Sequence, residues 1–110
     1  MNPTLQRHKF QMELTEIEDL FATIHALDSK DAMIGFLNDL WTRQELKVMA
    51  GRWRIAKLVH LGFPYRAVSN KTGASSATIS RIATHMVYGS GHLAGVCRIR
   101  EAQIKQEFDE

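Results

Sequence analysis

Apolar residues recur at helical spacing along most of the chain, and this pattern predicts an all-α protein. The first stripe consists of Leu14, Ile17, Leu20, Phe21, Ile24 and Leu27. A second helix is expected after a cap at Asp28 or Ser29. Its stripe consists of Met33, Phe36, Leu37 and Leu40. We expect five to six helices in one domain over residues 1–110, with an irregular start over residues 1–12 and flexibility there and in residues 89–110. A last helix over residues 92–108 is interrupted by Gly95.

The central helix is predicted over residues 43–61. Thr42 and Glu45 have the spacing of a capping box, in which each side chain satisfies a backbone N–H group of the other residue. Gly62 is expected to end the helix. The sequence is apolar around most of the helix, so it needs more neighbours than a chain of 110 residues readily supplies. We therefore expect a homodimer with a twofold axis.

Residues 64–86 have the pattern of a helix-turn-helix. Pro64 suits the first turn of a short helix, and Gly73 can end that helix in a left-handed backbone conformation. Ser75 or Ser76 can then cap a second helix. DNA-binding helix-turn-helix motifs have this length, and their second helix enters the major groove. An ordinary helical hairpin is the alternative interpretation.

The second helix of this motif has three faces. An apolar stripe is formed by Ile79, Ile82, Ala83 and Met86. A second face carries small or hydroxylic side chains, which let a helix lie deep in a groove and bond phosphates or base edges. The residues predicted to contact DNA from this helix and its cap are Ser75, Ser76, Ala77, Ser80 and Thr84. A third face carries Thr78, Arg81 and His85.

Charge is concentrated on the motif and the helix before it. The net charge is only +2, but residues 43–81 contain eight Lys and Arg and one acid, Glu45. Residues 1–42 contain three Lys and Arg and seven Asp and Glu. A basic stretch of this kind is what phosphate contact requires. The candidates for phosphate contact are Arg43, Lys47, Arg54, Arg66 and Lys71.

Several classes of protein are not indicated. The single cysteine, Cys97, cannot form an internal disulfide and is expected to be a buried thiol in the reducing cytoplasm. The chain has no apolar run long enough to span a membrane and no signal-peptide pattern. An enzyme using His60 or His85 as a base would need an orienting carboxylate, and none stands at a readable spacing. We expect no catalysis, metal site or cofactor.

Arg52 is the unusual residue of the central helix. One turn away it has apolar neighbours, which are Val48, Met49, Ile55 and Ala56. A guanidinium in such surroundings needs a carboxylate, a carbonyl or a bound anion. A structural ion pair and a ligand pocket are both open at this point.

Residues 42–81 resemble the Trp repressor superfamily, in particular its YerC/YecD-like branch. The matching residues are Thr42 with Glu45, Arg52 followed by Arg54-Ile55, Gly62, and Gly73-Ala74 leading to Ala77-Thr78-Ile79-Ser80-Arg81. The resemblance implies an intertwined all-helical homodimer, each subunit presenting its second motif helix to half of an operator. It also implies an effector pocket between the central helix and that helix. The residues at the matching pocket positions are Thr42, Arg52, Thr78 and Arg81.

The pocket departs from that of the Trp repressor at two positions. Ile82 stands where the repressor has glycine, and His85 stands where it has serine. Both side chains narrow the space for an indole. We expect the effector to be a smaller or differently shaped anion near Arg52 and Arg81, or the pocket to be filled by the protein itself. L-tryptophan should bind weakly or not at all.

The favoured function is a sequence-specific transcriptional regulator that represses by occupying double-stranded DNA as a homodimer in the cytoplasm. The alternative is a helical protein–protein adaptor whose basic face meets an acidic partner. Binding that depends on base sequence and falls steeply with salt would separate the two.

Overall fold

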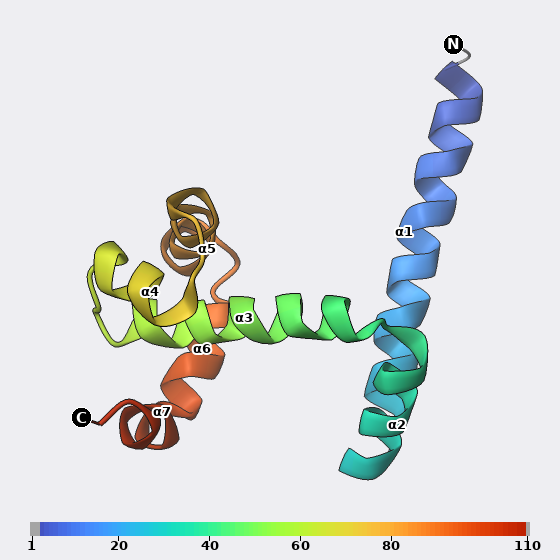
Figure 1. Ribbon diagram of the computed structural model, residues 1–110. Coiled ribbons are helices and arrows are strands. Elements are labelled where there is room, and N and C mark those ends of the chain that lie inside the picture. Colours follow the sequence, from blue (N-terminus) through green and yellow to red (C-terminus); the bar gives the residue numbers. More distant parts are fainter. Residues whose placement is uncertain (1–2, 110) are drawn as a thin grey trace. The chain divides into compact units, whose positions relative to one another are not determined.

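The computed structural model describes residues 3–109, except for the side chains of residues 3–5, 7, 8 and 10. Within this range the chain forms seven helices and no strand (Figure 1). They are α1 (Pro3–Ala26), α2 (Lys30–Leu40), α3 (Arg43–His60), α4 (Tyr65–Thr72), α5 (Ser76–Tyr88), α6 (His92–Ile99) and α7 (Glu101–Glu107). The all-α class is confirmed. The expected count of five to six is too low, because the chain turns at Arg100 and divides its C-terminal segment into two helices.

The chain divides into two compact units, residues 1–42 and residues 43–110. In the first unit, α1 already begins at Pro3, so the irregular start expected over residues 1–12 is wrong from that residue on. No proline or glycine stands between Thr4 and Ala26 to interrupt the helix. Ser29 caps α2, because its Oγ accepts a hydrogen bond of 3.0 Å from the N–H of Ala32. Asp28 is therefore not the cap.

Apolar side chains of the first unit are largely exposed. Phe21 is 63% exposed on α1, and Leu40 is 51% exposed on α2. No residue of α2 is buried. The two helices thus leave apolar side chains that they do not bury against each other.

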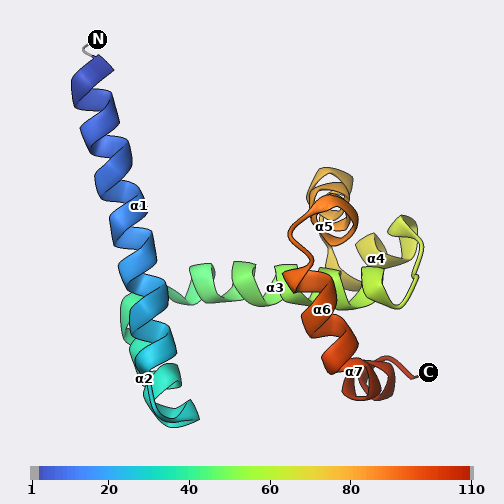
Figure 2. The ribbon, with the colours of Figure 1, turned by 180° about the vertical axis from the view of Figure 1, so that it is seen from behind.

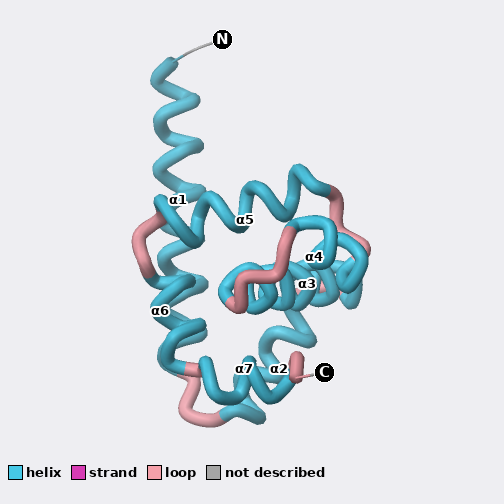
Figure 3. The backbone as a smooth tube through the Cα atoms, turned by 90° about the vertical axis from the view of Figure 1, so that its left-hand side faces the viewer, coloured by secondary structure: helices cyan, strands magenta, loops and turns pink. Residues whose placement is uncertain are grey.

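In the second unit α3 is the central helix. It begins at Arg43, directly after Thr42, and Gly62 follows it with φ +86°. These bounds are the ones that the capping box and the glycine predicted. α3 packs against α4, α5 and α6, and α7 packs against α6. Figures 1, 2 and 3 all show α5 on one side of α3 and α7 on the other, so α3 lies between α5 and α7, whereas α6 contacts both α3 and α5.

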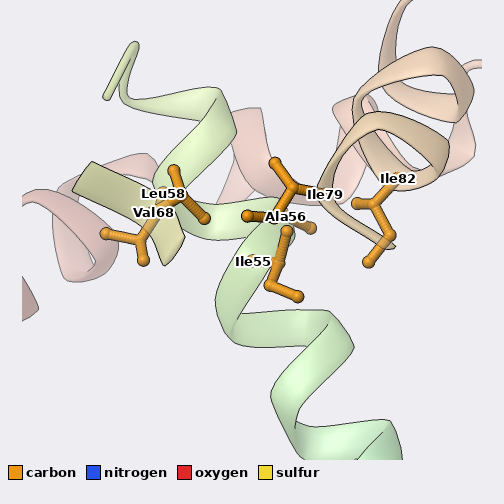
Figure 4. Close-up of a cluster of buried hydrophobic side chains, with 6 residues drawn as sticks. All are labelled: Ile55, Ala56, Leu58, Val68, Ile79 and Ile82. Atoms are coloured by element: carbon orange, nitrogen blue, oxygen red, sulfur yellow. The ribbon is translucent and has the colours of Figure 1, made fainter. Parts of the chain in front are cut away.

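The core of this unit joins α3 to both helices of the motif. Figure 4 shows the cluster, which consists of Ile55, Ala56, Leu58, Val68, Ile79 and Ile82. Leu58, Val68 and Ile79 are fully buried. Burial of one such side chain contributes about 1.5–3 kcal/mol, so this cluster holds α5 against α3.

Cys97 of α6 is also fully buried, as predicted. Burial raises the pKa of its thiol, and the nearby Lys57 ammonium opposes part of this rise. The thiol is therefore held in its neutral form.

Candidate nucleic-acid interface

The helix-turn-helix forms where the sequence predicts it. α4 begins at Tyr65, with Pro64 as its cap. Gly73 ends it at φ +74°, and the Gly73 N–H donates to the Ser69 carbonyl at 2.8 Å. A side chain other than glycine would be strained there. Ser75 caps α5, since its Oγ accepts from the N–H of Thr78 at 3.2 Å. Ser75, rather than Ser76, is the cap.

Side-chain hydrogen bonds fix the turn between α4 and α5. Thr72 Oγ1 donates to the Val68 carbonyl at 2.7 Å and accepts from the N–H of Ala74 at 3.1 Å. Ser69 Oγ donates to the Ala74 carbonyl at 3.0 Å. The angle between the two helices is thereby set by local bonds as well as by the core.

Over residues 76–84 the outward face of α5 carries small side chains, and the larger Val87 and Tyr88 are exposed in the last turn of the helix. The apolar stripe is turned inward, as predicted, because Ile79, Ile82 and Ala83 are buried. The exposed residues of the outward face are Ser76, Ala77, Ser80 and Thr84. Thr84 Oγ1 donates to the Ser80 carbonyl at 2.8 Å, so this hydroxyl is occupied within the helix. Among the described residues the hydroxyls of Ser76 and Ser80 have no partner, and they are free to meet a ligand.

The predicted phosphate contacts fall into three groups. Arg43 and Lys47 on α3 and Arg66 on α4 are exposed, and none has an ion-pair or hydrogen-bond partner within the described part of the chain. Lys71 Nζ lies 5.3 Å from the centre of the Phe63 ring. Arg54 differs from all of these, because it is paired with an acid, Glu107.

Arg54 is engaged by the C-terminal segment. Its guanidinium lies 5.0 Å from the centre of the Phe108 ring, and its Nη1 is 3.8 Å from Glu107 Oε1. α7, which carries Glu107, lies on the side of α3 that faces away from α5. The structure therefore does not bring Arg54 together with the helix-turn-helix.

The predicted effector residues on α3 and α5 share one hollow. Its volume is about 210 Å³, and it is lined by Arg52, Thr78, Arg81, Ile82 and His85. Neither guanidinium has an acidic partner among the described residues. Both residues are exposed, so water can solvate Arg52 and the expectation that it needs an ion pair or a bound anion is wrong. Thr42 belongs to the other unit, and its role remains a prediction.

A larger hollow adjoins the first one and shares Arg52 and Thr78 with it. Its volume is about 450 Å³, and its other lining residues are Gln44, Val48, Gly51, Ile55, Thr72, Gly73 and Ala74. No Asp or Glu lines either hollow. Gln44 was not among the predicted pocket residues, although Gln44, Val48 and Arg52 repeat every four residues and so share one face of α3.

The described residues contain no group of three or more His, Cys, Asp or Glu placed to bind a metal ion. His92 Nδ1, at the start of α6, is 2.8 Å from Ser90 Oγ. Within residues 3–109, no helix is long and apolar enough to cross a membrane.

Comparison with known proteins gives a consistent result. The Trp repressor protein family matches residues 15–99. The uncharacterized protein YerC of Bacillus subtilis is 32% identical over 89 residues, covering 80% of this chain and 86% of YerC. The crystal structure of a candidate Trp repressor from Staphylococcus aureus has a TM-score of 0.70 and 26% identity, covering 79% of this chain and 87% of that chain. A TrpR-like protein from Eubacterium eligens has a TM-score of 0.70 and 32% identity, covering 77% and 88% respectively.

Proposed function

Because this chain belongs to the Trp repressor family, a family of DNA-binding regulators, we propose that it is a sequence-specific repressor that binds an operator as a homodimer. The observation that carries the proposal is the outward face of α5. Its small side chains stand opposite the buried stripe of the same helix, so the helix backbone can approach base edges closely. The exposed cations Arg43, Lys47 and Arg66 supply charge for phosphate contact.

The proposed homodimer accounts for apolar surface that one chain leaves uncovered. In the first unit, Phe21 and Leu40 are more than half exposed. In the second unit, Val48 and Met49 of α3 are 43% and 46% exposed. A second copy would remove such surface from water, and a twofold operator would then be read by two copies of α5.

The hollow between α3 and α5 supports a small anionic effector. Two exposed guanidiniums line this hollow without an acidic partner, so a bound carboxylate or phosphate would make charge-assisted contacts with both. Such a ligand would contact both α3 and α5 and could favour one tilt of α5 for DNA binding. Ile82 and His85 occupy part of the same space, so the proposed ligand is smaller than L-tryptophan or differently shaped.

The proposed repressor acts in the cytoplasm, where Cys97 stays reduced. It acts by occupying DNA and not by a chemical reaction. The adaptor alternative uses the same basic residues to hold an acidic protein. The adaptor alternative does not explain why the side chains on the outward face of α5 are small, since a protein partner does not need close access to the helix backbone.

Selection of bound duplexes from a random DNA pool tests the proposal. We expect enrichment of one sequence with twofold symmetry, and an affinity that falls steeply as salt is raised. The selection is repeated with phosphate and with small carboxylates as probes of the hollow. A pool that stays random after repeated rounds would contradict sequence-specific binding and favour the adaptor.

A further inference from the structure

α7 meets α3 through opposite charges, on the side of α3 that faces away from α5. Lys57 Nζ is 2.8 Å from each carboxylate oxygen of Glu107, and Arg54 Nη1 is 3.8 Å from one of them. His60 Nε2 lies 3.1 Å from Glu101 Oε1. Two acids of α7 thus meet three basic residues of α3.

Apolar contacts hold α7 in this position. Ile104 is only 2% exposed, and Phe108 packs against the core cluster. The Phe108 ring also lies 5.5 Å from Lys57 Nζ and 5.0 Å from the Arg54 guanidinium, and the face of an aromatic ring attracts cations. Only 12% of the Lys57 side chain remains exposed.

Arg54, Lys57 and His60 recur every three residues and form one stripe along α3. Without α7 this stripe would be a second basic surface, on the opposite side of α3 from the proposed DNA-reading helix. Phosphate contacts do not depend on base sequence, so this surface would bind any duplex. Such binding competes with the operator, because a genome offers far more non-specific sites than operators.

We propose that Glu101 and Glu107 are specificity-determining residues of this protein. They hold the stripe of Arg54, Lys57 and His60 against α7, and so keep these three residues from contacting phosphate. The proposal rests on DNA binding as the proposed function. It concerns a segment that begins after residues 15–99, which are the part matched by the family.

The double variant Glu101→Gln/Glu107→Gln tests the proposal, because it removes both charges while nearly keeping side-chain shape. Binding is measured to a random-sequence duplex over a range of salt, and retention is measured on a heparin column. We expect the affinity for random DNA to rise roughly three- to tenfold at about 0.1 M salt. The slope of log K against log salt concentration should steepen by about 0.9 for each freed cation that contacts a phosphate. A purely structural role for the two acids would not raise either quantity.

The matched control is Glu16→Gln/Glu18→Gln on α1, which changes the net charge equally at two exposed acids. If the two double variants gained equally in affinity for random DNA and in retention on heparin, the proposal would be overturned. Adding Lys57→Gln to the first double variant should cancel most of its gain, and a gain that persists would also overturn it. Helix content is followed by circular dichroism, and the single variant Glu107→Gln repeats the test if the double variant unfolds.

Heparin retention separates this proposal from the proposed function. If the wild-type protein enriches no DNA sequence, sequence-specific repression is wrong, whereas the comparison of variants on heparin still decides whether α7 covers a polyanion-binding surface. If the wild-type protein does enrich a sequence, the variant should keep its operator affinity and lose selectivity against random DNA.

Discussion

Small side chains on the outward face of α5 determine how closely this helix can approach a base edge. Ala77 is exposed on the same face as Ser76 and Ser80, whose hydroxyls have no partner within the described residues. On the inward side, Ile79 is fully buried and fixes the rotation of the helix about its axis. A substitution at position 77 therefore changes the proposed interface without touching the core.

We expect Ala77→Glu to abolish DNA binding and to leave folding intact. The new carboxylate would face the phosphates and bases of the groove, where it is repelled and loses its hydration. Glutamate is a good helix former, so the cost in helix propensity is only a few tenths of a kcal/mol. A gel shift with the selected operator measures binding, and thermal unfolding measures stability. The exposed substitution Gln103→Glu in α7 is the control for charge, and normal binding by Ala77→Glu would show that α5 is not the reading helix.

The second prediction at this scale concerns L-tryptophan. Ile82 and His85 line the hollow with Arg52 and Arg81, so an indole has less room than at a site with glycine and serine. Isothermal titration calorimetry should detect weak binding or none. Micromolar affinity that is lost in Arg81→Ala would show that the hollow opens more than its side chains indicate.

At the scale of elements, α7 shows how a short helix can be held by a few long-range contacts. Its residues make ion pairs with α3, and Ile104 contributes the buried apolar anchor. Isolated helices of this length are not stable in water, so α7 depends on that anchor. The helix-turn-helix is different, because its caps and its turn are made by bonds between near neighbours in the chain.

Ile104→Ala should therefore destabilise the protein by about 2–4 kcal/mol, which is usual for removal of a buried isoleucine side chain. Urea denaturation followed by circular dichroism measures the change. Ile99→Ala is the matched control, because Ile99 is 82% exposed and its loss should cost less than about 0.5 kcal/mol. Equal effects of the two substitutions would mean that α7 is not anchored in the core.

At the scale of the whole molecule, the proposed dimer is the most direct consequence of the exposed apolar side chains. Sedimentation equilibrium at micromolar concentration should give about twice the chain mass of 12.5 kDa. Phe21→Glu, at a position that is 63% exposed in one chain, should weaken the dimer because it would place a charge in the interface. A folded wild-type monomer under these conditions would contradict the proposed homodimer.

The sequence alone was sufficient for the helix-turn-helix. Gly73 requires a left-handed backbone, Ser75 caps the next helix, and the spacing of Ile79, Ile82 and Ala83 selects its buried face. These signals act over a few residues, so local physics determines them. The convergence of Arg81 with Arg52 was also predicted, because face analysis and family resemblance agreed.

Only the tertiary structure decided the place of the C-terminal segment and the surroundings of Arg54. Glu107 is fifty residues from Lys57 in the chain, and no local pattern pairs them. The sequence shows three similar cations on one helix, Arg43, Lys47 and Arg54. Whether each of them contacts phosphate or forms an ion pair depends on which segment of the chain packs beside it. The path of the chain decides that Arg54 is ion-paired, since it determines which side of α3 packs against α7 and its two acids.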